Sequence, residues 1–193
     1  FSFNITPFLK KEKTQKLELK VWDPTDDGFQ PRGKQIKSPR GIWYTPVSGI
    51  WQTVWLEPVE KNYISKIHII PDIDNENISI KAVTSYDSKD DFLEIIINED
   101  GKIVSKVKVS YNPEIKIPIN NPKLWSPESP FLYELNIKLI SKGKVIDVVE
   151  SYAGMRKISV NKDVNGTLRM QLNNKDYFQF GTLDQGWWPD GLY

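Results

Sequence analysis

Apolar and polar residues alternate along most of this chain with a period of two, the pattern of β-strands that bury one face. Isoleucine, leucine or valine recurs at every second position, with lysine, serine or glutamate between them. The clearest of these segments lie at residues 17–21, 78–84, 93–97, 103–109, 115–119 and 133–139. No stretch has the 3.6-residue period of an amphipathic helix. We therefore expect an all-β protein.

The polar breaks between these segments have the chemistry of turns. Gly101 follows Asn-Glu-Asp, and Gly143 lies in Ser-Lys-Gly-Lys, positions where a hairpin uses positive φ. Most of the 13 prolines lie between the apolar runs, because proline cannot donate to a strand ladder. From about residue 63 to 155 we predict seven short antiparallel strands, as in an immunoglobulin-like β-sandwich.

The segments before and after the predicted sandwich differ from it in composition and pattern. Residues 1–60 are aromatic-rich and interrupted by proline and glycine, and we expect strands there, one of them at 17–21. Residues 156–193 predict a strand pair near 157–160 and 168–172, then a short strand at 177–181. Neither flank is expected to close a core alone. The chain begins with Phe1 rather than Met, so we expect the natural N-terminus to lie upstream.

Composition excludes several classes of function. The chain has 26 basic and 25 acidic residues, and its lysines are scattered, whereas a nucleic-acid site gathers basic residues on one face. No run of about 18 apolar residues is present to span a membrane. The absence of cysteine excludes disulfides, zinc–thiolate sites and cysteine nucleophiles. We therefore expect neither a nucleic-acid nor a membrane partner.

Few side chains lie near the other polar groups that a catalytic or metal-binding site requires. His68 is the single histidine and faces away from Ile67 and Ile69, so we expect it at solvent or at a domain seam. The aspartates before Gly28 miss the alternate spacing of a calcium loop, and Pro24 among them favours a polar turn. No metal or cofactor site is expected.

The positions of the glutamates and tryptophans along the predicted strands indicate structural roles. The strand glutamates Glu57, Glu94 and Glu134 are expected to face solvent. Trp51, Trp55 and Trp125 are expected to fill cores or seams.

Three passages, in chain order, resemble glycoside hydrolase family 2. Residues 3–6, 17–23 and 33–35 are similar to late strands of the family's N-terminal jelly roll, and 48–56 to the segment that leaves it. The third passage, 122–133, contains Leu-Trp-Ser-Pro-Glu-Ser-Pro-Phe-Leu-Tyr and is the most specific. It continues to 154–156, Gly-Met-Arg, which resembles the Gly-Phe-Arg that ends the family's immunoglobulin-like domain.

The resemblance implies three parts. Residues 1–60 would be the C-terminal part of a sugar-binding jelly roll, 61–157 the immunoglobulin-like sandwich, and 158–193 a linker and the first strand of a (β/α)8 barrel. The intact enzyme would hydrolyse terminal β-glycosidic bonds with retention, using two glutamates in the rest of the barrel, and would be β-galactosidase-like. Its partners would be its carbohydrate substrate and its own remaining jelly roll and barrel. A periplasmic or extracellular location is favoured for a polysaccharide-degrading bacterial enzyme.

The resemblance also implies a role for the end of the chain. Asp184, Trp187 and Trp188 follow the expected barrel strand, and loops at that end of a barrel strand form the active-site mouth. We therefore expect these three to contact substrate, whereas the chain itself contains no catalytic residue and should be inactive.

The sequence departs from the family in two places. Gln52 stands where many relatives carry arginine, and 180–186 lack the histidine and glutamate of the usual Arg-Gly-x-Asn-x-His-Glu string. The match to classical β-galactosidases therefore does not determine which sugar the enzyme takes. The alternative is a stand-alone carbohydrate-binding or adhesion β-sandwich. The tail favours the enzyme, because an adhesion module has no need of a barrel strand followed by Trp-Trp-Pro-Asp-Gly.

Overall fold

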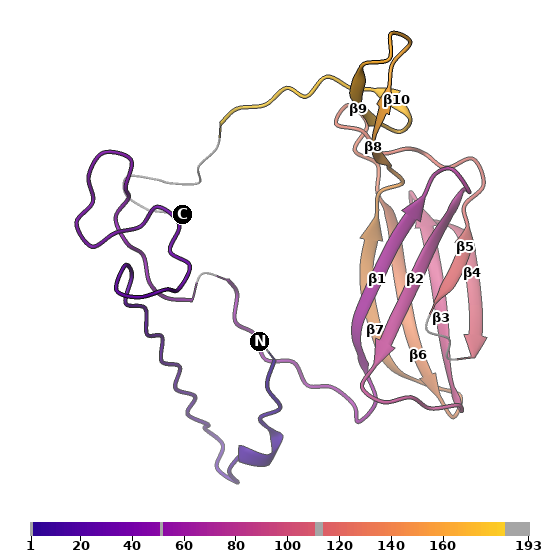
Figure 1. Cartoon of the computed structure of the whole chain (residues 1–193). Coiled ribbons are helices and arrows are strands. Elements are labelled where there is room, and N and C mark those ends of the chain that lie inside the picture. Colours follow the sequence, from indigo (N-terminus) through magenta and orange to yellow (C-terminus); the bar gives the residue numbers. More distant parts are fainter. Residues whose placement is uncertain (1, 51, 111–113, 184–193) are drawn as a thin grey trace. The chain divides into compact units, whose positions relative to one another are not determined.

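The computed structural model describes residues 2–50, 52–110 and 114–183. Two compact units divide the chain, one within the first 56 residues and the other covering Glu57–Leu183. All named strands lie in the second unit (Figure 1). Within the described residues the only helical element is a three-residue 3-10 turn, η1 (Thr6–Phe8), and no helix is long and apolar enough to cross a membrane. The predicted all-β class is confirmed.

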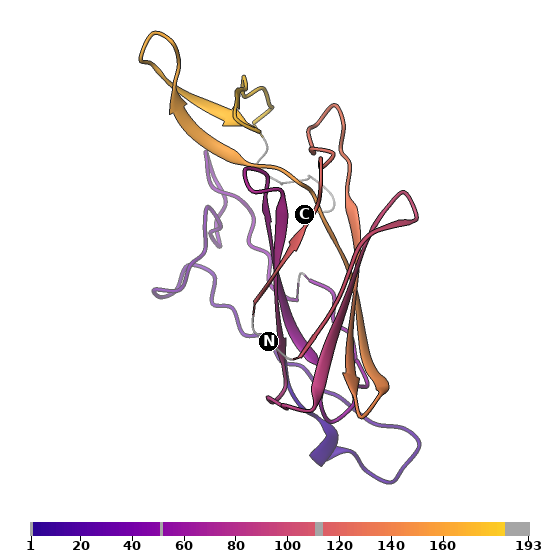
Figure 2. The ribbon, with the colours of Figure 1, turned by 90° about the vertical axis from the view of Figure 1, so that its right-hand side faces the viewer.

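Seven strands of the second unit form a two-layered antiparallel sandwich. They are β1 (Ile64–Asp72), β2 (Asn77–Thr84), β3 (Asp91–Glu99), β4 (Lys102–Ser110), β5 (Ile115–Pro118), β6 (Tyr133–Ser141) and β7 (Lys144–Ala153). One sheet has the order β1-β2-β5 and the other β4-β3-β6-β7, and Figure 2 shows them as separate layers. The predicted immunoglobulin-like sandwich is confirmed.

Alternation along each strand builds the core between the two sheets. Within β2, Ile78, Ile80 and Ala82 are buried, and within β3 the buried positions include Leu93, Ile95 and Ile97. The remaining members of the core are Ile64, Ile117, Ile119, Tyr133, Leu135, Ile137, Leu139, Ala153 and Met155. The first and last strands of the sandwich are also joined, because the amide of Ile64 donates to the carboxylate of Asp147 at 2.7 Å.

Two tight hairpins fix the register of the larger sheet. Asp100 and Gly101 link β3 to β4 with φ of 48° and 76°, and Lys142 and Gly143 link β6 to β7 with the same pair of values. Positive φ at both central residues is the geometry of a type I′ turn, whose twist matches that of the flanking strands. The predicted glycine turns are confirmed.

Tyr133 anchors the long loop that precedes β6. Its ring is fully buried, and its hydroxyl accepts a hydrogen bond of 2.8 Å from the amide of Lys123. The ring of Phe131 meets it edge to face at 5.0 Å. Burial raises the pKa of Tyr133, so the neutral phenol is the stable form beside this loop.

A second, smaller sheet follows the sandwich. β8 (Ile158–Lys162), β9 (Leu168–Leu172) and β10 (Lys175–Asp176) pair antiparallel in the order β10-β9-β8, which confirms the strand pair predicted near 157–160 and 168–172. Residues 177–183 form no ladder, although a strand was predicted at 177–181. A barrel strand pairs with a neighbour on each side, whereas the backbone pairing of this segment with the described residues is limited to one hydrogen bond, from the amide of Tyr177 to the carbonyl of Met170.

The first unit differs from its prediction. The segment 17–21 is not a strand, its apolar side chains are exposed, and the single β pairing within the described residues of this unit is a bridge between Gln35 and Tyr44. Alternation predicts which face a strand would bury, but a strand also needs a partner for its amides and carbonyls. Trp55, expected to fill a core, is 73% exposed; Trp51 lies outside the described residues.

The predicted polar turn near Gly28 is present. Asp23 Oδ1 accepts from the amide of Thr25 at 2.8 Å, and the amide of Asp27 donates to the carbonyl of Pro24 at 3.1 Å. The Asp23 carboxylate also accepts from the hydroxyl of Ser48 at 2.7 Å. Asp23 therefore works as a turn-forming side chain.

Replacing Ile95 by alanine should destabilise the sandwich by about 2–5 kcal/mol, because it leaves a cavity between the sheets. Ile103→Ala on β4 is the matched control: this side chain is 62% exposed, so its loss should cost no more than about 1 kcal/mol. Urea unfolding of the 193-residue chain measures both. Equal shifts for the two variants would contradict the assigned core.

Candidate functional site

The side chains predicted to contact substrate, Asp184, Trp187 and Trp188, lie outside the described residues. The structure does describe the segment that leads to them, 177–183, and the place where the chain leaves the sandwich. We call this place the joint: the loop 122–132, residues 154–157, the turn at 173–174, Asp74 and Tyr177. Both the sandwich and the small sheet belong to the unit Glu57–Leu183.

Trp125 lies at the centre of the joint. Its amide donates to the carbonyl of Met155 at 2.9 Å, and the guanidinium carbon of Arg156 lies 4.6 Å from its ring centroid, in cation–π range. A Cβ at Gly154 would approach the indole at 3.3 Å, so glycine allows the ring to lie close to the chain. Trp125, expected to be buried, is half-buried.

Asn173 ties three segments together with one side chain. Its Oδ1 accepts from the amide of Lys157 at 3.0 Å, and its Nδ2 donates to the carbonyl of Trp125 at 2.9 Å. Its own amide donates to the carbonyl of Lys157 at 2.8 Å. The backbone of Asn173 has a φ of 53°, a region that asparagine tolerates better than most residues.

Asp74, in the turn between β1 and β2, holds the other side of the joint. Its carboxylate pairs with Lys157 Nζ at 2.5 Å and accepts from Asn174 Nδ2 at 2.8 Å. The hydrogen bond from Lys157, followed by that from Asn174, lowers the pKa of Asp74. The charged carboxylate is therefore the form that the joint stabilises.

Tyr177 fixes the start of the exit segment. Its amide donates to the carbonyl of Met170 on β9 at 2.9 Å, and its hydroxyl donates to Glu128 Oε1 at 2.9 Å. This bond raises the pKa of Tyr177. Glu128 belongs to the Pro-rich loop whose sequence carried the resemblance, so this loop contacts the chain where it leaves the small sheet.

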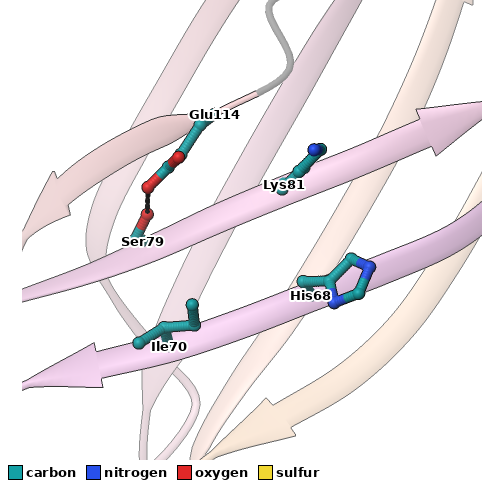
Figure 3. Close-up of a pocket in the computed structure, with 5 residues that line it drawn as sticks. All are labelled: His68, Ile70, Ser79, Lys81 and Glu114. Carbon is teal, nitrogen blue, oxygen red and sulfur yellow. Dashed lines mark hydrogen bonds between the residues drawn. The ribbon is translucent and has the colours of Figure 1, made fainter.

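A shallow depression of about 190 Å3 lies on the outer face of the β1-β2-β5 sheet, lined by His68, Ile70, Ser79, Lys81 and Glu114. Figure 3 shows His68 and Lys81 on neighbouring strands and the hydrogen bond from Ser79 Oγ to Glu114 Oε1, which measures 2.6 Å. His68 is exposed, as predicted. One histidine and one carboxylate already bonded to a hydroxyl do not make an acid–base pair.

The strand carboxylates serve in structure. Glu94 is partly buried rather than facing open solvent, and it lies between Lys106 at 3.1 Å and Lys138 at 3.4 Å. These lysines, Lys106 first, lower the pKa of Glu94, which suits an ion pair and not a general acid. Glu57 and Glu134 are exposed. Within residues 2–50, 52–110 and 114–183, no group of three or more acidic or histidine side chains could hold a metal ion.

Sequence reasoning missed the contribution of Asp74, Asn173 and Arg156. A signal for Asn173 was available, because the Asn-Asn pair at 173–174 is typical of a turn with positive φ. No local signal connects Asn173 with Trp125, which lies 48 positions earlier.

Replacing Asn173 by glycine should weaken the joint without straining the backbone, because glycine adopts positive φ freely. The amide of Lys157 then loses its acceptor, and its hydrogen-exchange opening free energy should fall by about 1–3 kcal/mol. Asn121→Gly, at an exposed position outside the joint that also has positive φ, should change this value by less than about 0.5 kcal/mol. Hydrogen exchange followed by NMR gives both values; equal protection in the two variants would show that the Asn173 side chain has no such role.

The Asp74 carboxyl should titrate below its ordinary value of 3.8. Folding lowers the pKa of Asp74, so the charged carboxylate stabilises the folded state. This contribution is fully present above the ordinary pKa of 3.8 and is lost as the pH falls through the lowered pKa of the folded state. The side-chain carboxyl carbon, followed by NMR, reports the midpoint. Lys157→Met should move the midpoint up toward the ordinary value, whereas Lys162→Met should leave it unchanged. A midpoint insensitive to Lys157 would contradict the pairing.

Comparison with known proteins adds to this geometry. Residues 62–156 match the family model of glycosyl hydrolases family 2. A putative β-glucuronidase of Formosa agariphila is 32% identical over 165 residues, covering 81% of this chain and 19% of that protein. A β-galactosidase of Thermoanaerobacter pseudethanolicus is 24% identical over 174 residues, covering 84% of this chain and 23% of that protein. The chain thus spans about a fifth of the length of these relatives.

Solved structures agree at the level of the fold. A β-glucuronidase from Ruminococcus gnavus in complex with D-glucuronic acid aligns with a TM-score of 0.51 at 15% sequence identity, over 63% of this chain and 20% of that one. The family match coincides with the sandwich, and it includes the loop of Trp125 and residues 154–156 of the joint. The chain therefore belongs to glycosyl hydrolases family 2.

Proposed function

We propose that this chain is a non-catalytic region of a family 2 glycoside hydrolase. In this proposal, residues 1–60 are the end of a sugar-binding jelly roll, 61–157 the immunoglobulin-like domain, and 158–193 the linker and start of the catalytic barrel. The family match at 62–156 and the small share of each relative that the chain covers support this division.

The joint is the observation that carries the proposal. Asn173, Asp74 and Tyr177 use their side chains to bind the linker to the sandwich. These contacts define where the chain leaves the unit. Such a connection is useful where the next domain must be held in a set position, because catalytic groups have to be placed to within fractions of an ångström.

The chemistry would then lie beyond the described residues. A retaining glycosidase needs a nucleophilic carboxylate and an acid–base carboxyl about 5–5.5 Å apart across the glycosidic bond. The described carboxylates with lowered pKa are held by partners, as Glu94 is by two lysines and Asp163 by Arg169 at 2.9 Å. A lowered pKa disfavours the protonated form that a general acid requires. We infer that both catalytic groups belong to the rest of the barrel.

Asp184, Trp187 and Trp188 are proposed as substrate contacts in the intact enzyme. An indole face packs against the apolar C–H face of a sugar ring, and a carboxylate accepts hydrogen bonds from its hydroxyls. The printed names of the relatives include β-glucuronidase and β-galactosidase, which makes terminal β-glycosides the substrate class to test.

The 193-residue chain should hydrolyse no nitrophenyl glycoside. The intact parent protein should hydrolyse a nitrophenyl β-glucuronide, β-galactoside or β-mannoside with retention of the anomeric configuration. NMR identifies the anomer that forms first and so measures retention. In the parent, Trp187→Ala and Trp188→Ala should each lower kcat/KM by about tenfold, equivalent to ~1.4 kcal/mol of transition-state binding.

Two results would contradict the proposal. Turnover by the 193-residue chain clearly above a buffer blank would place catalytic groups within it. A parent that is inactive on every β-glycoside would favour the carbohydrate-binding or adhesion module instead.

A further inference from the structure

The outer face of the β1-β2-β5 sheet carries a group of lysines together with the histidine. In the antiparallel register His68 is opposite Lys81, and Ser79, two residues before Lys81, is opposite Lys116. Directly opposed residues point to the same side of a sheet, and side chains two positions apart on a strand share a face. Lys66 therefore lies on this face with His68. The histidine and the lysines are all exposed.

These basic side chains lack the partners that the other sheet gives its lysines. On the outer face of the β4-β3-β6-β7 sheet, Lys106 and Lys138 both pair with Glu94. On the β1-β2-β5 sheet, Lys81 and His68 have no hydrogen bond or ion pair with any described residue. An unpaired ammonium group on a fixed strand raises the local concentration of anions, so this face favours a negatively charged ligand.

The acidic side chains of the same face already have partners. Glu114 accepts a hydrogen bond of 2.6 Å from the hydroxyl of Ser79, and Figure 3 shows it beside Ser79 rather than beside His68. Asp72 accepts hydrogen bonds from backbone amides in the turn that follows β1. Among the described residues the three lysines of this face exceed its two carboxylates, so its net charge is positive even when His68 is neutral.

The depression on this face combines an apolar wall with polar groups. Ile70 lines it and is 61% exposed, and Lys81 and the hydrogen-bonded pair of Ser79 and Glu114 supply its polar atoms. Its volume of about 190 Å3 is below the roughly 300–1,000 Å3 of sites that enclose drug-sized ligands. The depression therefore has room for about one sugar ring, and its ammonium group suits a ring that carries a carboxylate.

We propose that the outer face of the β1-β2-β5 sheet binds a carboxylate-bearing sugar unit of an acidic polysaccharide. Lys81 and His68 donate to the carboxylate, and Ile70 packs against C–H groups of the ring. The pair of Ser79 and Glu114 forms hydrogen bonds with the ring hydroxyls. The inference goes beyond the proposed function, because it concerns the sandwich and not the side chains expected to contact substrate.

A polymer is favoured over a free sugar or a simple anion. The depression is shallow, so the neighbouring units of a polysaccharide can continue along the sheet. Side chains two positions apart on a strand are about 7 Å apart, which lets Lys66 and His68 contact different carboxylates of one chain. A single exposed ion pair contributes little, whereas a second carboxylate on the same molecule binds at a high effective concentration.

The imidazole of His68 provides a direct test, because it is the single histidine of the chain and its ring protons report on this face alone. In NMR titrations of the 193-residue chain at constant pH and ionic strength, hexagalacturonate should shift these signals. It should bind at least about tenfold more tightly than D-galacturonate, acetate or inorganic phosphate. Maltohexaose has no carboxylate and should leave the signals in place. Added sodium chloride should weaken the binding of hexagalacturonate by screening.

A matched pair of variants adds a second measurement. Lys81→Met should weaken the binding of hexagalacturonate by about fivefold or more, equivalent to the loss of one charge-assisted contact. Lys144→Met removes the same charge from an exposed position at the start of β7 and should change the binding by less than about twofold. Because both side chains are exposed, neither variant should change the unfolding midpoint.

Several results would overturn the saccharide site. Equal binding of maltohexaose would exclude the role of charge, and equal binding of acetate or phosphate would leave only a general attraction for anions. Equal losses in the two lysine variants would show that the binding is not located at Lys81. In the intact parent, calorimetric binding of hexagalacturonate that is unaffected by Lys81→Met would exclude the site there. None of these readouts uses hydrolysis, so a parent that is inactive on every β-glycoside but binds through Lys81 would reject the proposed function and leave the saccharide site standing.

Discussion

The burial of isoleucine-rich strand faces between two sheets is the interaction on which the rest of the structure depends. Side chains such as Ile80, Ile95 and Ile137 are fully buried, and removing apolar surface from water is the main favourable contribution to folding. This core fixes the positions of the strand ends and, with them, the β1–β2 turn and the loop before β6. The joint is built on those ends, so its hydrogen bonds have fixed partners only because the sandwich is closed.

The joint differs from the core in its chemistry. Its contacts are hydrogen bonds, one cation–π contact and an ion pair, which depend on direction as well as on distance. Directional bonds from Asn173 and Tyr177 define one orientation. The fold therefore uses an apolar core for stability and a polar joint for position.

The sequence predicted the sandwich well because its signals are local. Alternation in 133–139 and glycine in the turns at Gly101 and Gly143 depend on near neighbours, and the resemblance of 122–133 is a continuous string. The predictions that were wrong concern features that depend on residues far apart in the sequence. Leu17 and Leu19 alternate with polar residues yet lie in no strand, since a ladder requires a partner segment that alternation does not identify. Trp125 is half-buried rather than buried, and its contacts with Arg156 and Asn173 could not be predicted because both residues lie far from it in the sequence. The predicted substrate contacts lie outside the described residues.

The bond between Ile64 and Asp147 has a consequence for synthesis on the ribosome. It joins the first strand of the sandwich to the last, 83 positions apart, so the sandwich cannot be completed until β7 has emerged. At about 5–20 residues per second, the amino-terminal strands wait several seconds with their apolar faces uncovered. During that interval the hairpin of β1 and β2 has an uncovered apolar face and unpaired edges, which are prone to wrong pairing. Lys66, Lys81 and His68 are exposed and keep the other side of this early hairpin hydrated.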